Sequence, residues 1–215
     1  MKNMSSEELY EARKEFFNER AENWLDMWYK DQETGKYDRY EKEFQRLFSL
    51  VPIKDGDHVL DVGCGSGVLV PYILERILDN GVLYELDYAE KMIEVNKRLH
   101  NDKRIKFLVS DIVDVPLESG SCDLVLCFSC FPHFQEKGQA MRAMARMLKK
   151  GGWLSVAHFD SSEELNNHHR KTSGPVMHDK LPDKKAMKRL FVNSGLKTEK
   201  FIDESGFYLI LGQLI

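Results

Sequence analysis

The pattern of hydrophobic and polar positions changes near residue 50 of this 215-residue chain. Before that point, apolar residues recur at helical spacing over residues 5–30, and a second helical stretch follows at about 37–50. After it, short apolar runs such as HVLDV and RIKFLVSD alternate with amphipathic stretches such as AEKMIEVNKRLH. This alternation predicts a parallel β-sheet with helices on both faces.

The same pattern predicts how the chain divides. Residues 1–50 form an N-terminal helical segment, and residues 51–215 form a single globular α/β unit. A polar stretch at about 160–182 interrupts that unit after the fifth predicted strand, and we interpret it as an insert. Beyond it, a helical stretch and two strand-like runs, LKTEKFIDE and FYLILGQLI, complete the pattern.

Composition narrows the possible classes of protein. The formal net charge is -4, with 31 basic and 35 acidic residues, so we expect no nucleic-acid partner. No apolar run approaches the ~20 residues that span a bilayer, and the first residues lack the apolar core of an export signal. Four cysteines are too few for a disulfide scaffold at this length. We therefore expect a cytoplasmic protein with free thiols and no membrane span.

A glycine-rich turn is the strongest local signal. In VLDVGCGSGVLV, Gly63, Gly65 and Gly67 follow a predicted strand and precede a predicted helix. At such a junction, backbone N–H groups and a helix N-terminus form a site for an anionic or polar ligand group. The dinucleotide fingerprint G-x-G-x-x-G would place its third glycine at Val68, one residue after Gly67. The turn predicts a ligand site in which the pyrophosphate fingerprint is broken.

Acidic residues end the next two predicted strands. Asp87 lies 20 residues after Gly67, where a carboxylate can accept hydrogen bonds from two ribose hydroxyls. Glu85 points to the same face of that strand, so either carboxylate could hold the ribose, and we favour Asp87. Asp111 ends the third strand, where it could accept from an adenine amino group while the Ile112 N–H meets a ring nitrogen. Together with the glycine turn, these residues predict a nucleoside ligand.

Four segments carry a resemblance to a known family. VLDVGCGSG, LYELDYAEKM, VSDIVDVPLESGSCDLVLCFSCFPHF and MLKKGGWLSVAHF are similar to successive motifs of the class I S-adenosylmethionine-dependent methyltransferases. The resemblance covers roughly residues 50–160. The FFNERAENW segment is similar to the N-terminal helix of the ubiquinone/menaquinone-methyltransferase-like branch. One departure is Glu85, where the family often has a small residue.

The resemblance implies a fold and a cofactor. The fold would be a Rossmann-like, doubly wound sheet of seven strands, mostly parallel with an antiparallel last strand, in a three-layer α/β/α arrangement. The cofactor would be S-adenosylmethionine, with residues 1–50 as a helical lid over it. Asp61 would orient the turn or the ammonium group, and Phe128 would lie near the transferring methyl group. The implied cofactor-binding residues are Asp61, Gly63, Cys64, Gly65, Gly67, Asp87, Tyr88, Met92, Asp111, Ile112 and Phe128.

Histidines gather where a methyl acceptor would bind. His133 follows the fourth predicted strand, His158 ends the fifth, and His169 lies in the polar insert. Methyl transfer needs a positioned nucleophile, and a histidine can serve as its general base. We therefore expect these three candidate catalytic residues to converge over the methyl group. The NNHHR segment also resembles an Asn-x-x-His element of relatives, which matches Asn166 and His169.

Other interpretations stay open from the sequence. Each histidine could be an ordinary loop residue, or the histidines could hold zinc or iron with Asp160, although their spacing matches no metal signature. Cys122, Cys127 and Cys130 fit a thiolate site poorly; we expect the first two to be buried and Cys130 to face the pocket. A non-catalytic S-adenosylmethionine-binding regulatory protein and an NAD-type oxidoreductase are the alternative functions. We expect a small-molecule acceptor, no metal, and a monomer or homodimer.

Overall fold

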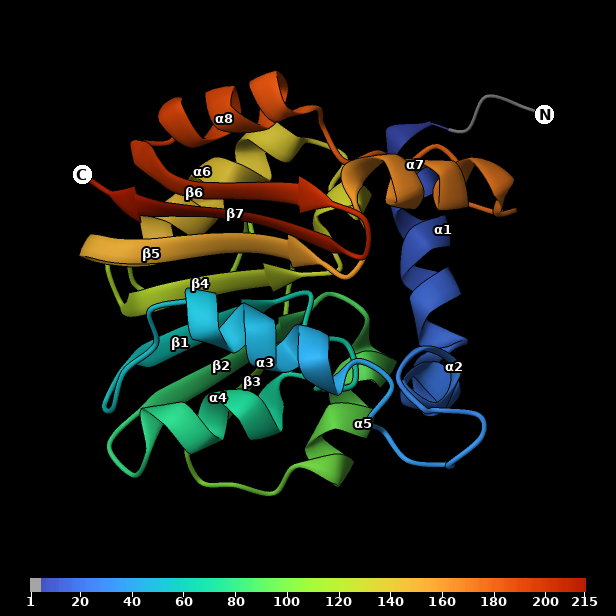
Figure 1. Cartoon of the computed structure of the whole chain (residues 1–215), viewed down its shortest axis with the longest axis horizontal. Coiled ribbons are helices and arrows are strands. Elements are labelled where there is room, and N and C mark those ends of the chain that lie inside the picture. Colours follow the sequence, from blue (N-terminus) through green and yellow to red (C-terminus); the bar gives the residue numbers. More distant parts are fainter. Residues whose placement is uncertain (1–4) are drawn as a thin grey trace.

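The computed structural model describes residues 5–215 and contains a seven-stranded sheet (Figure 1). The order of strands across the sheet is β3-β2-β1-β4-β5-β7-β6. Because the order reverses between β1 and β4, a crevice for a ligand is expected outside their carboxyl ends. The strands are β1 (His58–Val62), β2 (Val82–Asp87), β3 (Ile105–Val109), β4 (Cys122–Phe128), β5 (Leu148–His158), β6 (Leu196–Glu204) and β7 (Phe207–Leu214).

Every strand except β7 runs in the same direction. β1 pairs in parallel with β2 and β4, β2 with β3, and β4 with β5. β7 lies antiparallel between β5 and β6, to which it is joined by a tight turn at residues 205–206. Gly206 takes the positive φ of +75° that this turn requires. The predicted Rossmann-like sheet with an antiparallel last strand is confirmed.

Helices cover both faces of the sheet because the strands carry apolar side chains on both sides. On one face, Leu60 and Val125 belong to a core cluster with the buried methionines of α6 and α8. On the other face, Val59 and Leu124 pack with α3 and α4. The predicted three-layer arrangement is confirmed. The helices around the sheet are α3 (Glu41–Leu50), α4 (Val70–Ile77), α5 (Glu90–Leu99), α6 (Lys137–Met147) and α8 (Lys184–Val192).

Residues 5–30 lie at the carboxyl ends of the parallel strands, whereas α3, the last helix of the predicted N-terminal segment, packs on a face of the sheet (Figure 1). The single helix predicted over residues 5–30 is wrong, because the chain turns at residues 19–20. α1 (Ser6–Asn18) is followed by a 3-10 turn, η1 (Ala21–Asn23), and by the short α2 (Trp24–Trp28). Part of the predicted lid, residues 1–4, lies outside the described residues. In the described part of the chain, no helix has both the length and the apolar composition needed to cross a membrane.

The predicted polar insert forms α7 (Ser162–Lys171) and a loop that leads to α8. Ser161 and Glu164 form a reciprocal capping box, which satisfies backbone N–H groups at the start of α7. α7 lies beside the N-terminal segment, where the rings of Trp28 and His168 are 5.9 Å apart (Figure 1). The two segments therefore meet over the end of the sheet at which the ligand crevice is expected.

Candidate active site

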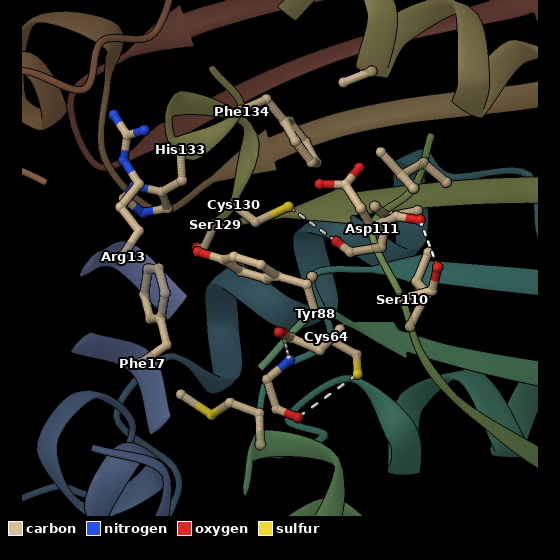
Figure 2. A pocket seen from close by; sticks show the side chains of 18 of the residues that line it. Arg13, Phe17, Cys64, Tyr88, Ser110, Asp111, Ser129, Cys130, His133 and Phe134 are labelled. Carbon is tan, nitrogen blue, oxygen red and sulfur yellow. Dashed lines mark hydrogen bonds between the residues drawn. The ribbon is translucent and has the colours of Figure 1, made fainter. Parts of the chain in front are cut away.

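A cavity of about 490 Å³ lies at the carboxyl ends of β1, β2 and β4, between the sheet and α1. Figure 2 shows Arg13, Phe17 and His133 at one end of it and Ser110 and Asp111 at the other. The volume is within the range of small-molecule sites, and open α/β sheets bind their ligands at this position. The cavity is therefore the candidate active site.

The glycine turn forms part of the cavity wall, and its backbone requires residues without side chains. Gly63, Gly65 and Gly67 have φ values of +68°, +54° and +85°. A Cβ atom on Gly63 would lie 2.6 Å from the Cβ of Cys130. Gly67 does not line the cavity, because it packs against α5, where a Cβ atom would lie 2.4 Å from Asn96 Oδ1. Gly63 and Gly65 thus expose backbone to a ligand, whereas Gly67 lets a helix approach the turn.

The N–H groups of this turn are already engaged within the protein. Those of Gly63 and Cys64 donate to the carbonyl of Leu86, at 2.8 and 3.0 Å. That of Gly65 donates to Asp87 Oδ2 at 3.0 Å. The expected site for an anionic or polar group built from these N–H groups is therefore wrong at these three residues. A pyrophosphate would find their donors already used.

Asp61 lines the cavity and has a carboxylate oxygen without a hydrogen-bond partner. Its side chain is 1% exposed, and Oδ2 has no hydrogen-bond partner. Burial, reinforced by the charges of Glu85 and Asp87, raises the pKa of Asp61 well above its usual range. A cationic group in the cavity would compensate this buried charge, since an unpaired carboxylate is costly in a dry environment.

Asp87 and Glu85 lie on the same strand but in different surroundings. Asp87 lines the cavity and accepts from the N–H groups of Gly65 and Ala89, at 3.0 and 2.9 Å. Burial raises the pKa of Asp87 to about 6. Glu85 lies outside the cavity wall, and its Oε2 accepts from Asn96 Nδ2 at 2.6 Å. Of the two carboxylates considered for the ribose, only Asp87 can reach a ligand in the cavity.

The other end of the cavity is bounded by aromatic and acidic side chains. Tyr10 of α1 packs on Tyr88 with ring centres 5.2 Å apart. Burial, with the nearby charge of Asp111, raises the pKa of Tyr10 to about 12. Ten of the eleven expected cofactor-binding residues line the cavity: Asp61, Gly63, Cys64, Gly65, Asp87, Tyr88, Met92, Asp111, Ile112 and Phe128.

Of the three histidines expected to converge, His133 and His169 are neighbours, with ring centres 5.3 Å apart. His133 lines the cavity, whereas His169 is buried and donates from Nδ1 to the carbonyl of Asp179 at 2.8 Å. His158 is buried and does not line the cavity, and its Nε2 has no partner. Burial lowers the pKa of His158 to about 3, so it stays neutral. Contact of each histidine with an acceptor stays a prediction.

Two residues that sequence reasoning missed complete the surroundings of His133. Asp179, in the loop after α7, is 3% exposed, and its Oδ2 accepts from His133 Nδ1 at 2.8 Å and from Arg13 Nε at 3.1 Å. Arg13 Nη2 also contacts Asp179 Oδ1, and Arg13 itself lines the cavity. Arg13 and Asp179 are 166 residues apart, and each stands among other charged residues, so no local pattern pointed to their pairing.

Comparison with known proteins shows what this chain is similar to. Residues 60–156, which include the carboxyl ends of β1, β2, β3 and β4, match the family model described as a methyltransferase domain. The resemblance to methyltransferases expected from the motifs is thereby confirmed.

The chain spans about half the length of the named relatives that it matches. The 27-O-demethylrifamycin SV methyltransferase of Amycolatopsis mediterranei is 30% identical over 118 residues, which are 53% of this chain and 43% of that protein. The ubiquinone biosynthesis O-methyltransferase of Bordetella avium is 28% identical over 129 residues, 53% and 52% of the two chains. A SAM-dependent methyltransferase from Aquifex aeolicus has the same fold, with a TM-score of 0.72 at 18% identity over 92% of this chain and 98% of that one.

The four cysteines are free thiols, and three of them are buried. Cys122 and Cys127 are buried, as expected, and Cys130 lines the cavity. Cys130 Sγ lies 3.2 Å from Cys127 Sγ and donates to the carbonyl of Val62 at 2.9 Å. The contact with Cys127, together with burial, raises the pKa of Cys130 well above its usual range. Thiolate chemistry on a soft substrate has no support in this arrangement.

The metal alternative requires several converging ligands. Among residues 5–215, no group of three or more His, Cys, Asp or Glu side chains is arranged to hold a metal ion. The Nδ1 atoms of His133 and His169 are both committed to Asp179. The histidines around the cavity therefore need a different explanation.

Proposed function

We propose that this chain binds S-adenosylmethionine in the cavity and transfers its methyl group to a small-molecule acceptor. The family match supports methyl transfer. The single observation that carries the cofactor assignment is that Asp61 lines the cavity and has a buried Oδ2 without a hydrogen-bond partner. S-adenosylmethionine has an ammonium group and a sulfonium, so it would bring positive charge to this acidic wall.

The charge of the cavity favours a cationic ligand over a dinucleotide. Among the described lining residues, Arg13 is the one arginine or lysine, and it is already paired with Asp179. A pyrophosphate would lie close to Asp61 and Asp87 with no free cation to neutralise it. The oxidoreductase alternative therefore lacks a phosphate-binding group. The acidic lining residues are Glu7, Asp61, Asp87, Asp111, Asp114 and Glu136.

Each end of the cofactor has a matching group in the wall. Asp61 would hold the ammonium group, and Asp87, whose oxygens each retain a free lone pair, would accept from the ribose hydroxyls. Asp111 and the N–H of Ile112 would hold the adenine. When bound, the cofactor supplies an electrophilic methyl carbon on its sulfonium. The protein then needs only to orient an acceptor in line with that carbon and to exclude water.

The acceptor end is lined by rings. Phe17, Phe134 and His133 stand around it, and the rings of Phe17 and His133 are 5.2 Å apart. Such walls suit a small, partly apolar acceptor. The names of the rifamycin- and ubiquinone-pathway relatives refer to small molecules, which supports the same class of acceptor here.

Isothermal titration calorimetry with S-adenosylmethionine, S-adenosylhomocysteine and NAD tests the proposal. We expect the first two to bind and Asp61→Asn to weaken S-adenosylmethionine binding about tenfold to a hundredfold, because a buried ion pair is lost. Glu85→Gln is the matched control, since it neutralises a neighbouring buried carboxyl outside the cavity wall. No affinity for either sulfur compound would refute the proposal. Production of S-adenosylhomocysteine over a panel of phenols, quinols, amines and thiols then separates transfer from binding alone.

A further inference from the structure

The carboxylate of Asp179 dictates which nitrogen of His133 carries the proton. An ionised carboxylate can only accept, so His133 Nδ1, 2.8 Å from Asp179 Oδ2, must donate. Burial raises the pKa of Asp179, but the hydrogen bonds from His133 and Arg13 outweigh it and hold that pKa below its usual range. Asp179 is therefore ionised at neutral pH. In the neutral imidazole, Nε2 keeps its lone pair.

His133 Nε2 is available to a ligand. Within residues 5–215 it makes no hydrogen bond, and the His133 side chain is 18% exposed at the cavity wall. The nearby charged or titratable groups include Asp179, Arg13, His158 and His169, and Lys137, which donates to the backbone carbonyls of residues 132 and 134. None of these groups forms a hydrogen bond with His133 Nε2. An acceptor in the cavity would meet a basic nitrogen there.

The loop that carries Asp179 is held by the Asn-x-x-His element of α7. Asn166 Nδ2 donates to the carbonyl of Leu181 at 3.0 Å, and the Leu181 N–H donates to Asn166 Oδ1 at 2.8 Å. One turn further along the helix, His169 Nδ1 donates to the carbonyl of Asp179 at 2.8 Å. Three hydrogen bonds thus fix the backbone on both sides of residue 180. This gives the NNHHR segment a physical role that the cofactor site did not explain.

Arg13 connects this arrangement to the N-terminal segment. It is 7% exposed and pairs with Asp179 from α1, so the positive charge of the pair comes from the segment that covers the cavity. A buried carboxylate without that partner would be costly. The orientation of His133 therefore depends on α1 being in place.

We propose that His133 Nε2 accepts the proton of a hydroxyl, amine or thiol acceptor, and that Asp179 is the positioning residue, held by Asn166 and His169, which keeps the ring in this tautomer. The inference rests on the proposed function. The acceptor's O–H, N–H or S–H bond breaks and its proton passes to Nε2. The acceptor's electron pair forms the bond to the methyl carbon, and the pair of the carbon–sulfur bond stays on sulfur. The imidazolium then returns the proton to water. The acceptor class is a small molecule with a dissociable proton.

The test reads the tautomer of His133 by ¹⁵N NMR on ¹⁵N-histidine-labelled full-length protein, with and without S-adenosylhomocysteine. The His133 resonances are assigned by their loss in His133→Gln. We expect a protonated Nδ1 and an unprotonated Nε2 in the wild type. Asn166→Ala should transfer the proton in part to Nε2, because the loop is released, whereas the matched Asn167→Ala should behave as the wild type. Asp179→Asn, which keeps the shape of the side chain and removes its charge, should also move the proton toward Nε2.

A wild-type proton on Nε2, or identical tautomers in Asn166→Ala and Asn167→Ala, would overturn the inference. Calorimetry with S-adenosylhomocysteine on the same samples separates the two proposals. If that compound does not bind, the proposed function fails, and the tautomer of the free protein still decides whether Asp179 orients His133. With any protic acceptor that the panel identifies, Asp179→Asn should lower kcat, measured at saturating S-adenosylmethionine, at least tenfold.

Discussion

At the scale of single residues, the site requires a glycine at position 63, where a side chain would not fit. Gly63 combines a positive φ with a close approach of Cys130, and no other residue type satisfies both conditions. The close approach matters for the chemistry because Cys130 leads directly into the turn that carries His133. Gly35 has a similar φ of +70° but has open space where a Cβ atom would stand. Alanine substitutions at Gly35 and Gly63 therefore separate the free-energy cost of the backbone conformation from the cost of crowding.

Gly63→Ala should destabilise the protein more than Gly35→Ala does. We expect the Gly35 variant to lose about 1 kcal/mol from the φ penalty alone, and the Gly63 variant about 3 kcal/mol or more because Cys130 must move as well. Urea unfolding of both variants measures the difference. Equal losses would show that Cys130 yields without cost, contrary to the packing described here.

At the scale of secondary-structure elements, β2 carries two carboxylates that lie in different surroundings. Asp87 ends the strand and faces the cavity, whereas Glu85 is covered by Asn96 of α5. Burial raises the pKa of Glu85 to about 7 from an ordinary value of 4.5. Between these two values the folded state binds a proton that the unfolded state has released. Glu85 therefore makes the free energy of unfolding fall as the pH rises from about 4.5 through 7.

Glu85→Gln should remove this part of the pH dependence. The variant should gain stability of about 1 kcal/mol or more at pH 8 and show little gain at pH 5, since Glu85 is neutral there in the folded state. Urea unfolding of the ligand-free protein at the two pH values measures the gain. A gain of the same size at both would contradict the buried titration.

At the scale of the whole molecule, the N-terminal segment is attached at several separate points. Asn18 Oδ1 accepts from the N–H of Lys91 at 3.1 Å at the start of α5, and Ser66 Oγ donates to the carbonyl of Ala21 at 3.2 Å. With the Arg13–Asp179 pair, these contacts hold α1 and η1 over the cavity. The cavity lies directly beneath this segment, so its opening is the expected route for ligand exchange.

Trypsin cleavage within residues 5–30 should slow when S-adenosylmethionine is added. A ligand that binds only the closed form at 100 times its Kd stabilises that form by about 2.7 kcal/mol, so cleavage should slow up to about a hundredfold. Cleavage at Lys103, an exposed residue in the turn before β3, is the internal control. Quantitative mass spectrometry of the fragments gives both rates. If both sites slow equally, or neither does, the segment is not a lid.

The chain's own pattern determined the sheet and the composition of the cavity wall. Alternating apolar runs dictate a buried parallel sheet, and such a sheet brings the residues at its strand ends, including Asp61, Asp87 and Asp111, to one edge. That Gly63 and Gly65 line the wall follows from the same geometry. These features depend on period and position along the chain, which can be read locally.

Only the tertiary structure decided which of these groups line the cavity and which residues support them. Glu85 and Asp87 share a strand face, yet α5 covers one and leaves the other open, because helix packing is set by side chains distant in sequence. The pairing of Asp179 with His133 could not be predicted from the sequence for the same reason. α7 holds the loop that carries Asp179, and Arg13 of α1 supplies the opposing charge from 166 residues away. The energetic effect of an ion pair depends on its burial, and burial is a property of the folded chain.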